Sequence, residues 1–441
     1  MARPDRPVRS RSTTAPTPEG ARRRSRAQPI RRPQPLRLRA RLRSLLGPST
    51  EVVRQSLVSL TLNSSTSLVA GAVLGAITDT FERLPGLLVL VPAAIGLRGN
   101  VFSALGNRLS TAIHLGNFRM SVRRQTLMGQ NVAASLVLTL MLSLVLAVVA
   151  KTVAVALGVM NTISILDLAL ISIVGGAIAS AVVLVATILL AAGSVRYGWD
   201  LDNLTAPLVS TLGDVLTLPA LWVASLLLDI EIFAGVLSGT MVVVVLVLFA
   251  AAWRSKQEVL RRVVRESLPI LFAAACLSTM AGIAIEKRLD TFSTYPALLI
   301  LFPAFISSAG ALGGILSSRL STKLHLGLMT PASFPNRDAR ADGLLILLLG
   351  IPVYLFNAFG AHFVGRLLGQ ASPGLARMAL VSLVGGAFAV LFVTAVAYYG
   401  TIAAVRFGAD PDTYGIPIIT SSVDFIGALA LIVVIVSVGI A

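Results

Sequence analysis

The chain has little charge for its size. Of its 441 residues, only 13% are charged, whereas 55% are hydrophobic and the mean hydropathy is +0.84. A soluble protein of this length could not cover so apolar a core with so few charges. Long apolar runs are what a lipid bilayer requires, at about 20 residues for each helical span. The composition therefore excludes a soluble globular protein and predicts an all-α, polytopic membrane protein.

The residues of soft-metal and catalytic sites are also scarce. Cys276 is the only cysteine, which excludes an internal disulfide and a thiolate metal site. The three histidines, His114, His325 and His362, make a transition-metal site an unfavoured alternative. The chain has no GxSxG, HExxH or P-loop motif. We therefore expect neither an enzyme nor a resident cofactor.

Most of the net charge of +17 lies in one segment. Residues 1–48 contain 14 arginines against two acids, Asp5 and Glu19, a net charge of +12. This segment is rich in Pro, Ser and Arg and lacks the apolar stretch of a signal peptide. Residues 1–50 are therefore predicted to be a disordered cytoplasmic tail attracted to anionic lipid. Since the rest of the chain is only mildly basic, no nucleic-acid partner is expected.

Eleven apolar segments are long enough to span a membrane. Lysines and arginines between them set the orientation: with the tail inside, cytoplasmic loops receive 15 and external loops only six. The positive-inside rule thus predicts an integral protein of the cell membrane with a cytoplasmic N-terminus and an external C-terminus. The segments are 57–77, 86–106, 127–150, 165–192, 207–228, 232–252, 268–286, 296–316, 343–363, 377–399 and 415–438.

One phrase of the sequence occurs twice. RLSTAIHLG at 108–116 returns as RLSTKLHLG at 319–327, 211 positions later. Further polar and glycine matches follow at an offset of 211 and then 210, and shared hydrophobicity cannot produce them. They predict a tandem duplication of a five-helix unit. The matched sets include Asp79-Thr80-Phe81 with Asp290-Thr291-Phe292, Pro92 with Pro303, Gly175-Gly176 with Gly385-Gly386, and Asp214 with Asp424.

The duplication defines the predicted domains. The first five-helix unit covers 51–228, a linking helix and a charged connector cover 229–267, and the second unit covers 268–441. Five crossings reverse the chain, so the unmatched segment at 232–252 restores its direction. The two units are then parallel and related by an axis along the membrane normal, with a central seam between them. Such a seam resembles a homodimer interface, so an oligomer is possible but not required.

Two aspartates inside predicted spans are the main candidates for function. Asp214 and Asp424 each stand seven residues after a proline, and hydroxyl residues, Thr211 and Ser421, precede them. Carboxylates in hydrocarbon are costly and usually functional. A capping or simply hydrogen-bonded role is the alternative, but two acids at equivalent positions favour a site. Paired carboxylates on a polar path suit a hard, partly hydrated divalent cation such as Mg²⁺.

A second candidate region carries proline and glycine inside a span. VPAAIGLRGN at 91–100 and FPAFISSAGALGG at 302–314 contain Pro92 and Pro303. They predict a broken or closely approached helix whose free carbonyls line a cavity; close packing through small residues is the alternative. The candidate pore or gate residues here are Gly99, Asn100 and Gly310. Asp79 and Asp290, at external span ends, are further candidates as acids that attract cations, unless they are plain solvated loop acids.

These motifs carry a family resemblance. PAAIGLRGNVFSALGNRLSTAIHLG, DNLTAPLVSTLGDVLTLPAL and, in the second half, PDTYGIPIITSSVDFIGALAL resemble the membrane domain of MgtE-type magnesium transporters. The chain resembles the two-repeat members of solute carrier family 41 more closely, over about residues 57–440. The resemblance implies Mg²⁺ or another divalent cation as substrate, with a selectivity acid in the last helix of each repeat. These acids fall on Asp214 and Asp424.

The chain also departs from that family. The Gly99-Asn100 pair becomes Gly310-Ala311 in the second copy, and Arg98 becomes Ala309, so the two copies differ near this helix. The soluble regulatory domains of MgtE channels have no counterpart. The leading interpretation is a divalent cation transporter with a pseudo-two-fold pore between the repeats. A Na⁺- or H⁺-coupled divalent cation exchanger is the alternative.

Overall fold

The computed structural model describes residues 50–114, 116, 118–159, 161–197, 201–325, 327–406 and 416–440. These residues belong to one compact unit, Leu45–Ala441. The predicted basic tail, apart from Thr50, lies outside the described residues.

The described part of the chain is helical and contains no strand. Eleven of its helices are long and apolar enough to cross a membrane, which confirms the predicted polytopic all-α architecture. They are α2 (Thr50–Ala76), α4 (Leu87–His114), α5 (Leu127–Ala156), α6 (Ile165–Tyr197), α7 (Leu201–Ser225), α8 (Glu231–Trp253), α9 (Glu258–Glu286), α11 (Ala297–His325), α12 (Arg337–Leu367), α13 (Leu375–Arg406) and α14 (Ile416–Ser437). The short elements are α3 (Thr78–Arg83), η1 (Leu226–Asp229) and α10 (Leu289–Thr294).

The charged connector is part of a spanning helix. Helix α9 begins at Glu258 and continues through Pro269, so the domain boundary predicted at residue 267 falls inside it. The first turns are amphipathic: Leu260, Val263 and Val264 are buried, while basic residues occupy the other face. An apolar stripe of this kind lets the helix start before its fully apolar segment does.

Helices α4 and α11 are continuous, so the expectation of a broken helix at Pro92 and Pro303 is wrong. A proline removes the hydrogen bond to the carbonyl four residues earlier. Here these carbonyls belong to Leu88 and Leu299, in the first turn of each helix. A bond lost so near a helix start disturbs little of the rest of the helix.

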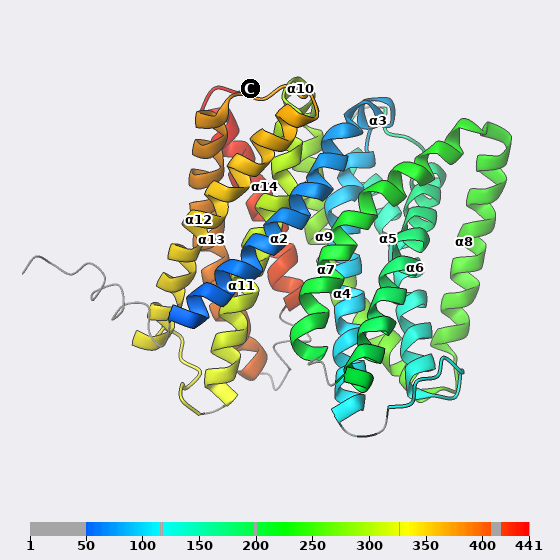
Figure 1. Ribbon diagram of the computed structural model, residues 1–441. Coiled ribbons are helices and arrows are strands. Elements are labelled where there is room, and N and C mark those ends of the chain that lie inside the picture. The colour runs from blue at the N-terminus through cyan, green and yellow to red at the C-terminus, as the bar shows by residue number, and fades with distance from the viewer. Residues whose placement is uncertain are drawn as a thin grey trace, which may run out of the picture. The chain divides into compact units, whose positions relative to one another are not determined.

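Both halves of the chain place their short helices at the same end of the bundle. Residues 51–228 are called the first half, and residues 268–441 the second half. Figure 1 shows α3 and α10 at the upper end of the bundle, and the loops after α4 and α11 at its lower end. Helices α4 and α11 therefore run in the same direction.

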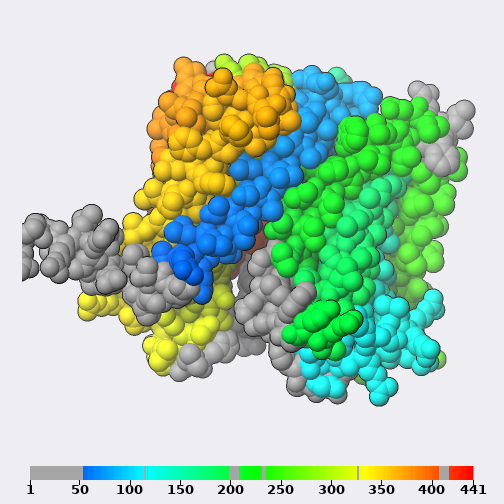
Figure 2. Space-filling model, in the orientation of Figure 1, coloured from blue at the N-terminus to red at the C-terminus, as the bar shows by residue number. Residues whose placement is uncertain are grey.

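The first helix of each half packs against the other half. Helix α2 lies on α11 and α12, and α9 lies on α4 and α5. On the face drawn in Figure 2, α2 runs obliquely between α12 and α7. The crossings depend on glycine: a Cβ on Gly71 would overlap the carbonyl oxygen of Ile300, and one on Gly282 would overlap that of Val89. Small residues allow such close helix contact in a membrane, where apolar surfaces alone give little attraction.

Candidate functional site

Asp214 lies where both halves meet. It is carried by α7, and its side chain is buried, with 6% of its surface exposed. Its Oδ2 accepts hydrogen bonds from Ser67 on α2, at 3.4 Å, and from Ser307 on α11, at 3.5 Å. Ser307 also donates to Oδ1 of Asn63, on α2, at 3.2 Å. The carboxylate of the first half thus contacts a helix of the second half through a small polar network.

Asp424 has a similar setting with different partners. It is carried by α14 and is half-buried. Its Oδ2 accepts a hydrogen bond of 2.5 Å from Ser278 on α9. On α4, a Cβ placed on Gly96 would lie 3.7 Å from the same oxygen. This carboxylate therefore sits between its own half's first helix and the other half's second helix, as Asp214 does.

The residues that contact the two aspartates are related by the same sequence offset as the repeated motifs. Ser67 and Ser278 are 211 residues apart, as are Gly96 and Ser307. Asp214 also lies within electrostatic reach of Asp424. The structure therefore brings together the two acids that the sequence singled out, at the junction of the two halves.

Other predicted site residues lie on the helices next to these acids. Gly99 on α4 faces α7: a Cβ on Gly213 would lie 3.4 Å from its backbone nitrogen. On α11, a Cβ on Gly310 would lie 3.6 Å from the Thr420 methyl. Both glycines thus lie at ordinary contact distance from the last helix of a half, and their role in a pore or gate stays a prediction. The remaining candidates on these helices are half-buried (Asn100, Thr211) or buried (Ser421, Pro92, Pro303).

Asp79 and Asp290 are not part of this junction. They are exposed residues of the short helices α3 and α10, at the end of the bundle where both helices lie (Figure 1). A role in attracting cations stays a prediction for them.

Sequence reasoning missed the three serines that contact the acids. Ser67 and Ser278 stand at the same offset as the recognised matches and inside predicted spans, so this signal was available. Ser307 has glycine as its counterpart and left no such signal. Its role follows only from the packing of α11 against the first half.

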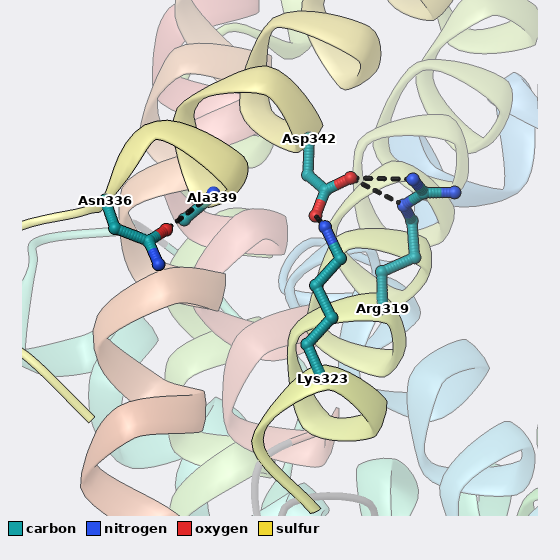
Figure 3. Close-up of polar contacts among 5 residues, drawn as sticks. All are labelled: Arg319, Lys323, Asn336, Ala339 and Asp342. Carbon is teal, nitrogen blue, oxygen red and sulfur yellow. Dashed lines mark hydrogen bonds and ion pairs between the residues drawn. The ribbon is translucent and has the colours of Figure 1, made fainter. Parts of the chain in front are cut away.

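The opposite end of the bundle holds an ion-pair cluster in the second half. Asp342 on α12 is buried and accepts hydrogen bonds from Arg319 on α11, at 3.0 Å from Nε and 2.6 Å from Nη2 (Figure 3). Lys323, one turn further along α11, pairs with the other carboxylate oxygen. Helix α12 begins beside it, where the Asn336 side chain accepts from the Ala339 nitrogen at 2.9 Å.

In the first half, α4 and α5 are connected at the same place, but α5 supplies an amide where α12 supplies a carboxylate. Arg108 donates to Asn131 on α5 at 2.8 Å, and it interacts electrostatically with Glu266 on α9. Arg108 and Arg319 are 211 residues apart, as are Asn131 and Asp342. The repeated phrase thus joins the second helix of each half to the third.

The oxygen groups at the junction suit a hydrated cation. Within the described residues, no three His, Cys, Asp or Glu side chains gather into a metal cluster. His362 contacts Ser372 at 2.8 Å, while the side chains of His114 and His325 lie outside the described residues. Two carboxylates with serine hydroxyls are hard oxygen ligands. The fold and this junction define a helical membrane protein with two acids, one buried and one half-buried, between two similar halves.

Comparison with known proteins identifies the family. The model of the MgtE family, described as divalent cation transporters, matches residues 91–224 and 302–434. The chain belongs to the MgtE family of divalent cation transporters, and it is therefore a transporter and not an enzyme.

Curated relatives extend the similarity over most of the chain. Solute carrier family 41 member 2 of Xenopus laevis is 26% identical over 87% of this chain and 71% of its own length. The human member 2 is 25% identical over 86% of this chain and 69% of its own length. Member 3 of Rattus norvegicus is 23% identical over 86% of this chain and 85% of its own length. No solved structure matches the chain.

Proposed function

We propose that the chain carries Mg²⁺ across the membrane along a path between its two halves, with Asp214 and Asp424 in contact with the hydrated ion. The observation that carries this proposal is the pair of acids at the junction, within electrostatic reach of each other. Two carboxylates held in hydrocarbon repel each other and are costly to ionise. A divalent cation between them removes both costs.

The chemistry of the junction favours Mg²⁺ among divalent cations. Mg²⁺ loses its water shell reluctantly and is bound through a few carboxylates and retained waters. Carboxylates can accept hydrogen bonds from that shell, and Ser67, Ser278 and Ser307 fix their orientation. Two negative charges also favour a divalent over a monovalent ion.

The test is Mg²⁺ flux into proteoliposomes. We expect Asp214→Asn and Asp424→Asn each to lower the flux by about 100-fold or more, because each removes one of two charges opposite the ion. Asp167→Asn is the matched control, since Asp167 is a half-buried acid in the first turn of α6 that bonds to Ser164 and not to the junction. Wild-type flux in both variants, in folded protein, would remove the acids from the path.

The same assay separates a channel from an exchanger. Flux that is driven by the Mg²⁺ gradient alone supports a channel. Flux that requires a Na⁺ or pH gradient supports a coupled exchanger, in which the acid pair also binds the coupling ion.

The orientation follows from loop charge and is part of the proposal. The end that carries α3 and α10 faces outward, and the end with Arg319 and Asp342 faces the cytoplasm. Single cysteines test it in a variant whose Cys276 is replaced by alanine. A membrane-impermeant maleimide should label Arg288→Cys in intact cells and Arg119→Cys only after lysis; the reverse pattern would invert the orientation.

The arrangement of the halves is proposed as two parallel repeats related by an axis along the membrane normal. The shared end of α3 and α10 and the matched contacts of Ser67 and Ser278 support it. One chain then supplies both sides of the path, so a dimer is not needed for transport.

The Arg-rich tail is proposed to bind anionic lipid, which vesicle flotation with and without phosphatidylserine would test.

A further inference from the structure

Arg98 is a buried cation without a counter-charge. It stands on α4 and has no exposed surface. Its Nη1 donates to the carbonyl oxygen of Ala94, one turn earlier. Its Nε and Nη2 have no hydrogen-bond partner among the described residues, and no described carboxylate forms an ion pair with it. A guanidinium stays charged in proteins, and an uncompensated buried charge is strongly unfavourable. This position therefore calls for a negative partner.

Three hydroxyls of the neighbouring helices are also buried without partners. Thr139 and Ser143 lie one turn apart on α5, and Ser180 lies one turn after Gly176 on α6. A Cβ placed on Gly176 would lie 2.5 Å from Ser143 Oγ and 3.0 Å from Arg98 Nη2. The guanidinium and the Ser143 hydroxyl thus face the same spot on α6. We call Arg98, Thr139, Ser143 and Ser180 the hydroxyl–guanidinium cluster.

The second half fills the same place with uncharged, mostly apolar groups. The counterparts of the cluster, by the sequence offsets, are Ala309, Gly350, Tyr354 and Val390. A Cβ on Gly350 would lie 3.2 Å from Val390 and 3.9 Å from the Tyr354 ring, so the counterparts of the three hydroxyl residues adjoin one another. Because the same helices pack together in both halves, we expect the three hydroxyls to adjoin one another as well, beside the guanidinium at Gly176.

The comparison also shows what the cluster is not needed for. The Tyr354 hydroxyl donates to the carbonyl oxygen of Phe305 at 3.3 Å. Phe305 is the counterpart of Ala94, whose carbonyl accepts from Arg98. Both halves therefore give this carbonyl an extra donor, and in the second half a neutral phenol suffices. The charge and the three unpartnered hydroxyls of the first half remain unexplained by the fold.

We propose that the hydroxyl–guanidinium cluster binds a small monovalent anion, for which chloride is the probe. All of its free groups can donate hydrogen bonds, and none is a carboxylate, which is the donor set that an anion requires. Water could satisfy the hydrogen bonds, but it would leave the charge of Arg98 uncompensated. The close packing of α5 and α6 around Gly176 favours a monatomic ion over a larger oxyanion.

The anion would be a resident part of the first half. Arg98 adjoins α7 through its Cβ, 3.5 Å from a Cβ placed on Gly213, the residue before Asp214. The guanidinium extends from there toward Gly176 on α6, and the field of its uncompensated charge is strong in a low dielectric. A bound anion cancels that field.

The experiment measures the thermal stability of the purified full-length protein in detergent. Chloride is titrated against gluconate at constant ionic strength, so that only specific binding changes the melting temperature. We expect a saturable rise on the order of a few degrees for the wild type. The readout does not involve transport, so it stands or fails independently of the proposed function.

The decisive variant gives the first half the residue types that the second half has at two of these positions. Arg98→Ala combined with Ser143→Tyr removes the charge and supplies a phenol to the Ala94 carbonyl. We expect this variant to be folded and its melting temperature not to respond to chloride. Thr187→Val is the matched control on α6, because the Thr187 hydroxyl bonds within its own helix to Val183; it should keep the full response.

Three results would overturn the proposal. The first is a wild-type melting temperature that chloride does not change, which would mean that water hydrates the cluster. The second is a chloride response in the double variant equal to that of the wild type. If the double variant does not fold, the single variants Thr139→Val and Ser180→Ala replace it. We expect each to raise the half-saturating chloride concentration about five-fold. The third result that would overturn the proposal is a half-saturating chloride concentration that neither variant changes.

Discussion

The two halves of the molecule hold equivalent acids in unequal surroundings. Asp214 is buried and faces hydroxyls from α2 and α11, whereas Asp424 is half-buried and, among the described residues, accepts from the Ser278 hydroxyl of α9. Where the first acid meets Ser307, the second meets Gly96. The helices that surround each acid thus correspond, while the side chains that contact the acids differ.

The opposite end of the bundle shows the same kind of exchange. In the second half, Arg319 takes its carboxylate from α12, through Asp342. In the first half, Arg108 has Asn131 at the matching position and takes its negative charge from Glu266 on α9. Gln55 is the counterpart of Glu266. Each arginine keeps one nearby acid, but the helix that supplies it differs. The two halves thus share the balance of charge at this end and not the residue that provides it.

The largest expected effect tests whether the two helix crossings are equivalent. Gly71→Val and Gly282→Val place a side chain on a backbone carbonyl of the crossing helix, which neither helix can move away from easily. We expect each to cost about 3 kcal/mol or more of stability, and both to cost the same. Thermal unfolding of the purified variants measures this. Gly314→Val on α11 is the control, since its Cβ would meet nothing within 4 Å.

If only one of the two crossings tolerated valine, the two crossings would not be equivalent. It would mean that α2 and α9 are held by different forces, although their glycines stand 211 residues apart in the sequence.

The next effect concerns the ion-pair cluster. Asp342→Asn gives the second half the amide of the first, but it leaves Lys323 without a carboxylate. We expect a loss of about 2 kcal/mol, because removing one member of a largely buried ion pair strands the other. Adding Lys323→Ala, which copies Ala112 of the first half, should recover part of that loss. A double-mutant cycle on thermal stability checks it, and additive losses would show that Lys323 does not interact with Asp342.

Some of this could be predicted from the sequence, and some could not. The number of spans follows from apolar length, because a bilayer needs about 20 residues for each crossing. The acid pair follows from the cost of placing Asp214 and Asp424 in hydrocarbon. The start of α9 was placed too late, because its charged but amphipathic first turns were interpreted as a connector between helices. The predicted break at Pro92 was wrong because that proline stands too near the start of α4 to interrupt the helix.

The exchange of first helices between the halves was not predictable from periodicity. In a membrane every helix is apolar over most of its surface, so hydropathy does not say which neighbour it chooses. The choice depends on small residues such as Gly71 and on the shape opposite them. For the same reason Ser307 could not be placed beside Asp214 before α11 was seen to cross α2.

The acids themselves offer a smaller and more specific test. Ser278 is the one hydroxyl that the described residues direct at Asp424, whereas Asp214 has both Ser67 and Ser307. We expect Ser278→Ala to raise the half-saturating Mg²⁺ concentration about ten-fold, since a hydrogen bond to a charged group is lost. Ser67→Ala should raise it only about two-fold. Adding Gly96→Ser to Ser278→Ala should restore part of the Mg²⁺ affinity. If Ser278→Ala and Ser67→Ala raised the half-saturating Mg²⁺ concentration equally, the two acids would not differ in how strongly they depend on a serine.

The smallest expected effect concerns the exposed acids of α3 and α10. Asp79→Asn and Asp290→Asn remove charges that stand at the same end of both halves, outside the buried junction. They act on the approach of the ion and not on its binding, so the double variant should lower Mg²⁺ flux about two-fold at low ionic strength. At about 0.5 M salt the difference should vanish, because the screening length is then only a few ångströms. Asp167→Asn, which removes a half-buried acid in the first turn of α6, should change the flux less. A loss that persists at high salt would mean that one of these acids contacts the ion directly, and the path would then include the end helices as well as the junction.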